Sequence, residues 1–430
     1  MTTPVELRVT RMGAAGDGIA ALPDGTTCFV PRALPGETVG ATPLARSRDG
    51  LRARLDAVIL ASTDRVTPPC VHFEQGCGGC AVQHWAPGAQ AGWKRARVAE
   101  ALSRAGFPAA PVAPTIATPM GLRRRADLAL RRGPGGIRIG FHAAGSAEVL
   151  DLDACPVLDA RLVALIGPLR ALLRRLPALR REGSAVVNLL DTGPDLLLRT
   201  DGPIGPAERA LLAAFASEAG LPRIAWAEGN AVPEVAVQHG PVGIALSGVT
   251  VVPPPGAFLQ ASPAGEAAII AAVLAGLPAR LAGRGRIADL HAGLGTLSIP
   301  LAARGRVAAF ESDAGAVAAL SAAAGRAGLP LAATRRDLAR QPLTLAELAP
   351  FAAVVLDPPF AGAAEQAALL ARSAVPVVVY VSCSPAALSR DAKAFAQAGW
   401  QVAAATPVDQ FVHSAQVEAV VVLTRARARV

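Results

Sequence analysis

The chain has 430 residues, too many for one compact core, so its length predicts two or three domains. Its 42 lysines and arginines exceed its 33 acidic residues, giving a net charge of +9, and arginine runs stand at residues 123–125 and 131–132. Arginine binds phosphate through paired hydrogen bonds, so the charge favours a nucleic-acid partner, although a genome-wide arginine bias would give the same total. The apolar stretches are too short for a membrane helix, and the first residues do not read as a secretory signal. We therefore expect a cytoplasmic, monomeric protein without membrane association.

Four segments differ in their sequence pattern. Residues 1–60 alternate apolar and polar side chains between frequent glycines and prolines, which predicts a small OB-like β-barrel. Residues 61–93 hold three cysteines and show little periodicity of apolar side chains. We expect a loop-rich connector that is stabilised by something other than a hydrophobic core. Residues 94–255 mix strand-like runs with amphipathic helices, which predicts a central α+β domain. In residues 256–430 apolar strands alternate with alanine-rich helices, so we expect a C-terminal Rossmann-like α/β domain with a doubly wound parallel sheet.

The first strand of the C-terminal domain ends in the sequence DLHAGLGT, residues 289–296. Glycines in such a turn let the backbone approach a ligand closely. The next strand ends in Glu311, where an acid can accept hydrogen bonds from both ribose hydroxyls, and Asp337 follows where it can meet an adenine amino group. This order is typical of class I S-adenosylmethionine methyltransferases, whereas a dinucleotide site would carry a third glycine. The expected cofactor-binding residues of this domain are His291, Gly293, Gly295, Thr296, Glu311, Asp337 and Asp357.

Two later residues decide which atom we expect to be methylated. The motif DPPF, residues 357–360, by itself points to an exocyclic amine, with the aromatic ring stacked on the base. Cys383, however, ends the following strand, and a thiolate added at C6 of uracil makes C5 nucleophilic. Glu418 begins the last strand and could then remove the C5 proton. We therefore predict a uridine-C5 methyltransferase with Cys383 and Glu418 as catalytic residues; an N-methyltransferase and an inactive RNA-binding protein are the alternatives.

The connector supplies a third pattern. Cys70, Cys77 and Cys80 have the spacing C-x6-C-x2-C, and Cys155 is the obvious fourth ligand. Four thiolates can bind zinc or an iron–sulfur cluster, and the spacing does not choose between them.

Taken in order, these motifs resemble the RNA uridine-C5 methyltransferases of the TrmA and RlmD type over nearly the whole chain. By this resemblance the first 60 residues are a TRAM domain, an RNA-binding barrel, with GDGIA at 16–20 and LPGE at 34–37. The segment GAFLQAS resembles the family's Phe-x-Gln segment, which implies that Phe258 shapes the uridine pocket and that Gln260 contacts the methyl donor. The resemblance also implies a [4Fe–4S] cluster on the four cysteines, and the cluster favours ribosomal over transfer RNA as the substrate.

The chain departs from the family's pattern at several positions. Ser384 follows the nucleophile where the family usually has Asn, and Phe360 stands where Arg is usual. His291-Ala292 replaces Phe-Cys, and Ser262 replaces a common Asn. Arg123 stands where the family has a Tyr-Arg-Asn pattern, and we expect it, with Phe258 and Phe360, to contact the RNA substrate.

Overall fold

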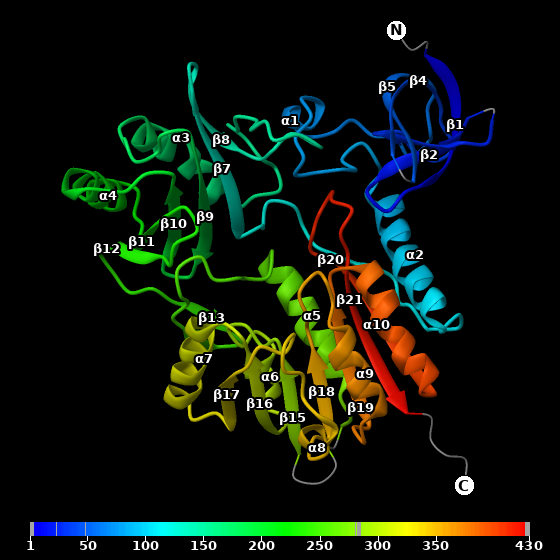
Figure 1. The fold of residues 1–430 in the computed structure, drawn as a ribbon, viewed down its shortest axis with the longest axis vertical. Coiled ribbons are helices and arrows are strands. Elements are labelled where there is room, and N and C mark those ends of the chain that lie inside the picture. Colours follow the sequence, from blue (N-terminus) through cyan, green and yellow to red (C-terminus); the bar gives the residue numbers. More distant parts are fainter. Residues whose placement is uncertain (1–3, 23, 48, 280, 282–284, 426–430) are drawn as a thin grey trace.

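Three bodies of secondary structure follow one another along the chain: a barrel, a sheet with two helices, and a larger sheet with helices on both faces (Figure 1). The structure is a computed structural model that describes residues 4–22, 24–47, 49–279, 281 and 285–425. The expected multidomain architecture is thereby confirmed. Within the described ranges, no helix combines the length and the apolarity needed to cross a membrane.

The N-terminal barrel is closed by strands in the order β1-β2-β3-β5-β4. They are β1 (Val5–Met12), β2 (Asp17–Ala21), β3 (Thr27–Pro31), β4 (Thr38–Ser47) and β5 (Gly50–Leu60). Alternate side chains such as Leu7 and Val9 point inward and are buried, as the period of two requires. Glu37, in the LPGE motif, is fully buried and accepts hydrogen bonds from the backbone N–H of Leu34 at 2.8 Å and from Arg65 Nε at 2.6 Å. This buried acid joins the barrel to the connector that follows.

Helix α2 (Pro87–Ala105) leaves the connector and runs beside α10 (Pro385–Gln397) of the C-terminal domain (Figure 1). Its apolar face, including Val98, is buried in the core of that domain. Strand β6 (Ile116–Ala117) then pairs with the outer edge of the same sheet. The sequence assigned residues 94–255 to the central domain; the first part of this range instead packs with the C-terminal sheet, because the apolar side of α2 is complementary to α10.

The central domain is a six-stranded sheet, β12-β11-β10-β9-β7-β8, with α3 and α4 against it. Its elements are β7 (Arg125–Gly133), β8 (Gly136–Gly140), α3 (Ala160–Arg174), β9 (Glu182–Leu190), β10 (Gly193–Thr200), α4 (Pro206–Glu218), β11 (Arg223–Glu228) and β12 (Glu234–Gln238). Helix α3 buries Leu162, Leu165 and Leu169 at helical spacing. Arg132 donates to the carbonyl of Leu179 at 2.7 Å, so this member of the second arginine run points inward and does not offer its charge to RNA.

The C-terminal sheet has the order β17-β16-β15-β18-β19-β21-β20-β6. Its strands besides β6 are β15 (Arg286–Leu290), β16 (Arg306–Glu311), β17 (Leu331–Arg335), β18 (Ala353–Leu356), β19 (Val377–Ser382), β20 (Trp400–Asp409) and β21 (Glu418–Arg425). The five strands β15 to β19 are parallel, as expected. The expectation of a parallel sheet is wrong for β21, which is antiparallel to both of its neighbours. The short connection from β20 to β21 imposes this direction, because a parallel pair needs a long crossover.

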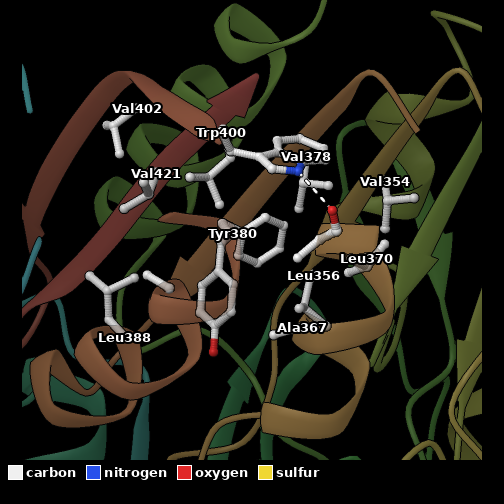
Figure 2. Packing of buried hydrophobic residues seen from close by; sticks show 14 of the residues in the cluster. Val354, Leu356, Ala367, Leu370, Val378, Tyr380, Leu388, Trp400, Val402 and Val421 are labelled. Atoms are coloured by element: carbon white, nitrogen blue, oxygen red, sulfur yellow. Dashed lines mark hydrogen bonds between the residues drawn. The ribbon is translucent and has the colours of Figure 1, made fainter. Parts of the chain in front are cut away.

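The remaining elements complete the layers around this sheet. They are the hairpin β13 (Ile244–Leu246) with β14 (Val249–Val251), and the helices α5 (Pro263–Gly276), α6 (Ser298–Leu301), α7 (Ala314–Arg326), α8 (Leu345–Leu348) and α9 (Ala364–Arg372). In the core under α9 and α10, the indole nitrogen of Trp400 donates to the carbonyl of Ala371 at 2.9 Å (Figure 2). Tyr380, on β19, is fully buried and donates its hydroxyl to Asp391 at 2.7 Å. These bonds satisfy the polar atoms of two large aromatics, and they hold β20 against α9 and β19 against α10.

Candidate active site

One edge of the C-terminal sheet gathers the residues that the sequence singled out. His291, Glu311, Asp357 and Cys383 stand at or just after the carboxyl ends of four parallel strands, which meet at the same edge. Because β21 is antiparallel, its first residue, Glu418, lies at that edge as well. The reversed strand therefore brings an acid to Cys383, which a sixth parallel strand starting at the same residue would not do.

Cys383 and Glu418 are adjacent by strand register. Ser382 pairs with Ala419, so the next residues along each strand, Cys383 and Glu418, come opposite one another. Burial, followed by the charges of Glu418 and Asp357, raises the pKa of the Cys383 thiol to about 12. The thiol is therefore protonated at neutral pH until a neighbour takes its proton.

Three buried carboxyl groups share this edge. Burial raises the pKa of Glu418 to about 7 and that of Asp289 to about 7. The pKa of Asp357 is also raised, first by burial and then by the charges of Glu418 and Asp289. Because like charges this close disfavour joint ionisation, the group holds protons at neutral pH. A carboxyl group that titrates near neutrality can both accept and release a proton under physiological conditions.

The turn after β15 is shaped for close approach of a ligand. Gly293 and Gly295 have φ angles of 54° and 91°, in the region that favours glycine. A Cβ atom at Gly295 would lie 2.3 Å from a methyl group of Leu320, whereas one at Gly293 would meet no heavy atom of the described residues within 4 Å. The amide of Gly293 donates to Glu311 Oε2 at 2.9 Å, which orients that carboxylate beside open space. The turn therefore leaves room for a ligand beside the Glu311 carboxylate.

Polar groups with spare bonding capacity surround this turn. His291 has a φ angle of 64°, and its buried Nε2 atom has no partner among the described residues. Burial lowers the pKa of His291, although Glu311 and Asp337 oppose this shift, so the ring is neutral at pH 7. Asp337 is half exposed, and Thr296 lies at the end of the turn, partly exposed. A buried ring nitrogen without a partner indicates that a ligand completes the site.

The segment 256–262 enters the site from the central domain. Phe258 and Phe360 are 66% and 60% exposed, which is unusual for phenylalanine and leaves both rings free to stack on a base. Gln260 is buried, and its backbone carbonyl oxygen accepts a hydrogen bond from Arg124 Nε at 3.1 Å. Arg124 also pairs with Glu266 at 2.5 Å. The first arginine run is thus partly internal, and Arg124 holds the site together instead of meeting RNA.

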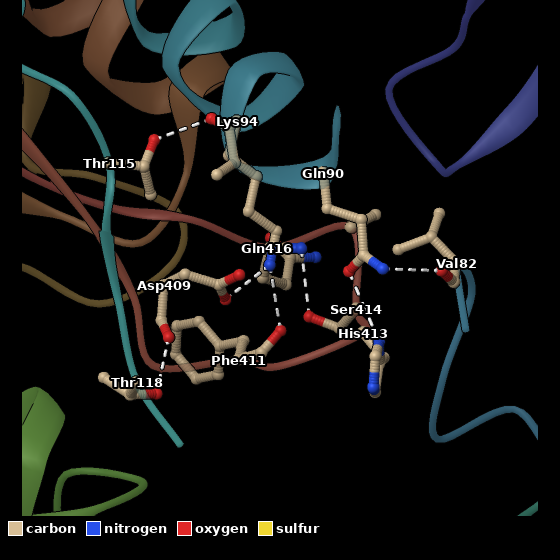
Figure 3. A network of polar contacts seen from close by, with 12 residues as sticks. Val82, Gln90, Lys94, Thr115, Thr118, Asp409, Phe411, His413, Ser414 and Gln416 are labelled. Atoms are coloured by element: carbon tan, nitrogen blue, oxygen red, sulfur yellow. Dashed lines mark hydrogen bonds and ion pairs between the residues drawn. The ribbon is translucent and has the colours of Figure 1, made fainter. Parts of the chain in front are cut away.

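The loop before Glu418 is held by two other parts of the chain (Figure 3). The fully buried Lys94 of α2 pairs with Asp409 at 2.5 Å. The carbonyl of His413 accepts from the backbone N–H groups of Ala81 and Val82, at 2.8 and 3.0 Å, directly after the last cysteine of the connector. These contacts could not be predicted from the sequence; the one available signal was that Lys94 is one of only two lysines in an arginine-rich chain.

The four cysteines of the expected metal site come from two separate segments of the chain. Cys70 precedes the short helix α1 (Val71–Glu74), and Cys155 lies between β8 and α3. Burial, with smaller contributions from the charges of Cys155, Cys77 and Cys70, raises the pKa of Cys80 to about 12, so the four thiols influence one another electrostatically. Arg123 interacts electrostatically with Cys155 and Cys80, which places it beside the cysteines. In the part of the chain that the structure describes, no three His, Cys, Asp or Glu side chains are arranged to hold a metal ion.

Comparison with known proteins identifies the family. Residues 331–426 match the family described as tRNA (Uracil-5-)-methyltransferase, and residues 273–377 match one described as Conserved hypothetical protein 95. The chain is 35% identical over 430 aligned residues to the 23S rRNA (uracil(1939)-C(5))-methyltransferase RlmD of Chromohalobacter salexigens, covering 97% of this chain and 89% of that protein. The chain belongs to the RNA uracil-C5 methyltransferases.

Two further similarities extend over the same length. An uncharacterized RNA methyltransferase of Brucella suis is 40% identical over 428 residues, 98% of each chain. The crystal structure of Pyrococcus abyssi tRNA (uracil-54, C5)-methyltransferase in complex with S-adenosyl-L-homocysteine covers 98% of this chain and 100% of that one, with a TM-score of 0.74 and 20% identity. At that identity the likeness concerns the fold alone. Membership of the uracil-C5 family confirms the expected enzyme class with its methyl donor, S-adenosylmethionine, and disfavours the exocyclic amine as the target.

Proposed function

We propose that this uracil-C5 methyltransferase modifies a uridine of 23S ribosomal RNA in the cytoplasm, with Cys383 as nucleophile and Glu418 as base. The choice of ribosomal RNA rests on the RlmD relative, whose similarity spans nearly both chains. The observation that carries the mechanism is the strand register that places Cys383 opposite Glu418. Gln260, His291, the glycine turn with Thr296, Glu311, Asp337 and Asp357 would hold the methyl donor, and Phe258 and Phe360 would stack on bases of the RNA.

The site residues divide the chemistry into two halves. Cys383 must first lose its proton, and Asp357, whose charge reaches the thiol, is the acceptor available while Glu418 is kept ionised for the later step. The thiolate adds to C6 of the uracil, and the π-electron pair of the C5=C6 double bond moves toward C5 and the C4 carbonyl. S-adenosylmethionine, when bound, supplies the electrophilic methyl group to C5. Glu418 then removes the C5 proton, the C5=C6 double bond re-forms and the Cys383 thiolate leaves C6.

The proposed substrate predicts a specific loss in the cell. RNA from a strain that lacks this protein should lack 5-methyluridine at one position of 23S ribosomal RNA, while its transfer RNA keeps the modification. Mapping by mass spectrometry of RNA fragments measures both, and a plasmid copy of the gene should restore the modification, whereas a Cys383→Ala copy should not. Loss confined to transfer RNA would overturn the choice of substrate but not the chemistry.

We also propose that Cys70, Cys77, Cys80 and Cys155 bind a [4Fe–4S] cluster. Their mutual electrostatic influence across two separate segments supports a shared ligand. One tetrahedral ion needs its sulfur ligands within about 3.8 Å of one another, whereas a four-iron cluster binds each thiolate to a different iron. The choice of a cluster over zinc rests on the resemblance to the RlmD-type members of the family, since the spacing of the cysteines does not choose between the two. Binding would displace the thiol protons and order the loop-rich connector.

The cluster predicts iron in the isolated protein. Anaerobically purified enzyme should be brown and contain about four irons per chain. Cys80→Ala should lose the colour and most of the iron, because one ligand is removed, whereas Cys383→Ala should keep both. Elemental analysis and the absorbance spectrum measure the two quantities. One zinc per chain without iron would refute the cluster.

A further inference from the structure

The residue after strand β20, Gln410, belongs to no motif singled out in the sequence, yet it joins two groups of the site. It is 4% exposed, and its Nε2 atom donates to Glu418 Oε2 at 2.8 Å and to Gln260 Oε1 at 2.8 Å. Its Oε1 atom accepts from the backbone N–H of Ala261 at 3.0 Å. Glu418 is 8 residues away from Gln410 in the sequence, whereas Gln260 and Ala261 are 150 and 149 residues away.

The contact with Ala261 fixes which way the amide of Gln410 points. A backbone N–H can only donate, so the atom that faces it must be the amide oxygen. The NH2 group must therefore face Glu418 and Gln260. Gly265 in α5 packs directly against Gln410, because a Cβ atom at position 265 would lie 2.5 Å from Cβ of Gln410 and 3.2 Å from its Oε1, so only glycine leaves room for this side chain. The main chain just before it is held too, because the hydroxyl of Thr118 donates to the carbonyl of Asp409 at 2.6 Å.

We infer that Gln410 is a positioning residue that keeps Glu418 in its carboxylate form and aims it at the reacting uridine. This rests on the proposed role of Glu418 as the base. An N–H donor stabilises a carboxylate more than the neutral acid, because the charged oxygen is the stronger acceptor. The hydrogen bond from Gln410 favours the ionised form of Glu418, whereas burial favours the protonated form of the acids at this edge.

The other groups around Glu418 act in the opposite direction. Asp357 after β18 interacts with it as a like charge, and Cys383 after β19 becomes negative when it acts. Burial is the main influence on the pKa of Glu418, which it raises, and the hydrogen bond from Gln410 lowers that pKa. No Lys, Arg or His of the described residues adds to these influences on Glu418. Gln410 is therefore the group that favours the ionised base.

Replacing the donor without changing size gives a direct test. Gln410→Glu keeps an oxygen for Ala261 but exchanges the NH2 group for an acceptor, so the pKa of Glu418 should rise. Because the base acts as a carboxylate, proton removal should then require higher pH. We expect the pH of half-maximal C5-proton release, followed as tritium lost from RNA that carries 5-tritiated uridine, to move up by about one to two units. Below that pH, a covalent enzyme–RNA adduct should accumulate on denaturing gels, and raising the pH should release it.

Two further variants separate positioning from general stability. Gln410→Leu removes the donor without adding charge and should shift the profile in the same direction by a smaller amount. Gln366→Leu is the matched control: Gln366 is an equally buried amide that bonds only with the backbone of Leu343, away from the site, and the profile of this variant should not move.

The outcomes distinguish this inference from the mechanism on which it rests. Glu418→Gln is measured in parallel. If it traps an adduct while Gln410→Glu keeps the wild-type pH profile, the role of Gln410 is refuted and the base stands. If Glu418→Gln turns over without an adduct, the base assignment fails and the role of Gln410 fails with it. An equal shift in Gln366→Leu would show a general effect of instability and would also overturn the inference.

Discussion

Cys383→Ala should abolish methylation, with a loss on the order of 10⁴-fold or more, because no other group in the site can add to C6 of the uracil. Binding of S-adenosylhomocysteine, measured by calorimetry, should persist, since the expected cofactor contacts come from Glu311, Asp337 and the glycine turn. RNA that contains 5-fluorouridine should form a gel-stable adduct with the wild-type enzyme, because the base cannot remove fluorine as a cation. The same RNA should form none with Cys383→Ala.

The chain offers a matched control for this substitution. Cys28 is fully buried in the core of the N-terminal barrel, so Cys28→Ala removes a thiol of the same size without touching the site. It should lose some stability and retain methylation and adduct formation. A Cys383→Ala enzyme that still methylates RNA would overturn covalent catalysis and revive the exocyclic-amine mechanism through Asp357 and Phe360.

Glu418→Gln should stop the reaction at a later point than Cys383→Ala does. Loss of a general base lowers turnover by about 10²–10⁴-fold. Addition of the thiolate should remain possible, because removing the charge of Glu418 removes one of the influences that raise the pKa of Cys383. The C5 proton would stay after methyl transfer, so methylated RNA should remain attached to the enzyme, visible as a shifted band on a denaturing gel.

The stoichiometry of the trapped band tests the assignment. When the transferred methyl group is labelled, the band should contain one labelled methyl group per enzyme. Heating with excess thiol should not be needed to detect this label. Glu365, an exposed glutamate of α9, supplies the control, and Glu365→Gln should turn over normally without a trapped species. Rapid turnover by Glu418→Gln would assign proton removal to another carboxyl group, with Asp357 as the neighbour to examine next.

Much of this molecule could be predicted from contiguous stretches of sequence. The glycine turn at 289–296, the acid Glu311 and the motif around Cys383 lie at the ends of apolar strands, and parallel strands bring their carboxyl ends to one edge. The alternating pattern of the first 60 residues predicted a barrel, which closes as expected. These predictions succeed because the period of side-chain burial and the direction of a parallel strand are local properties.

The arrangement of the base depended on pairing that the sequence does not display. An apolar run such as 419–423 reads the same in either direction, so the reversal of β21 became visible only with its partners β19 and β20 in place. The same holds for α2, whose pattern shows an apolar face but not that α10 covers it. Arg124 reads as part of a surface charge run, whereas the fold turns it onto Glu266.

By itself, the sequence determined the enzyme class, the methyl-donor fold and the identities of the candidate nucleophile and base, because each depends on a residue type at the end of a recognisable strand. Only the tertiary structure decided how these groups influence one another. Lys94 and Asp409 are 315 positions apart and Gln410 and Gln260 are 150 apart, yet they form buried bonds. Protonation and hydrogen-bond direction depend on burial and on neighbours within a few ångströms, and a chain acquires both only when distant segments pack together.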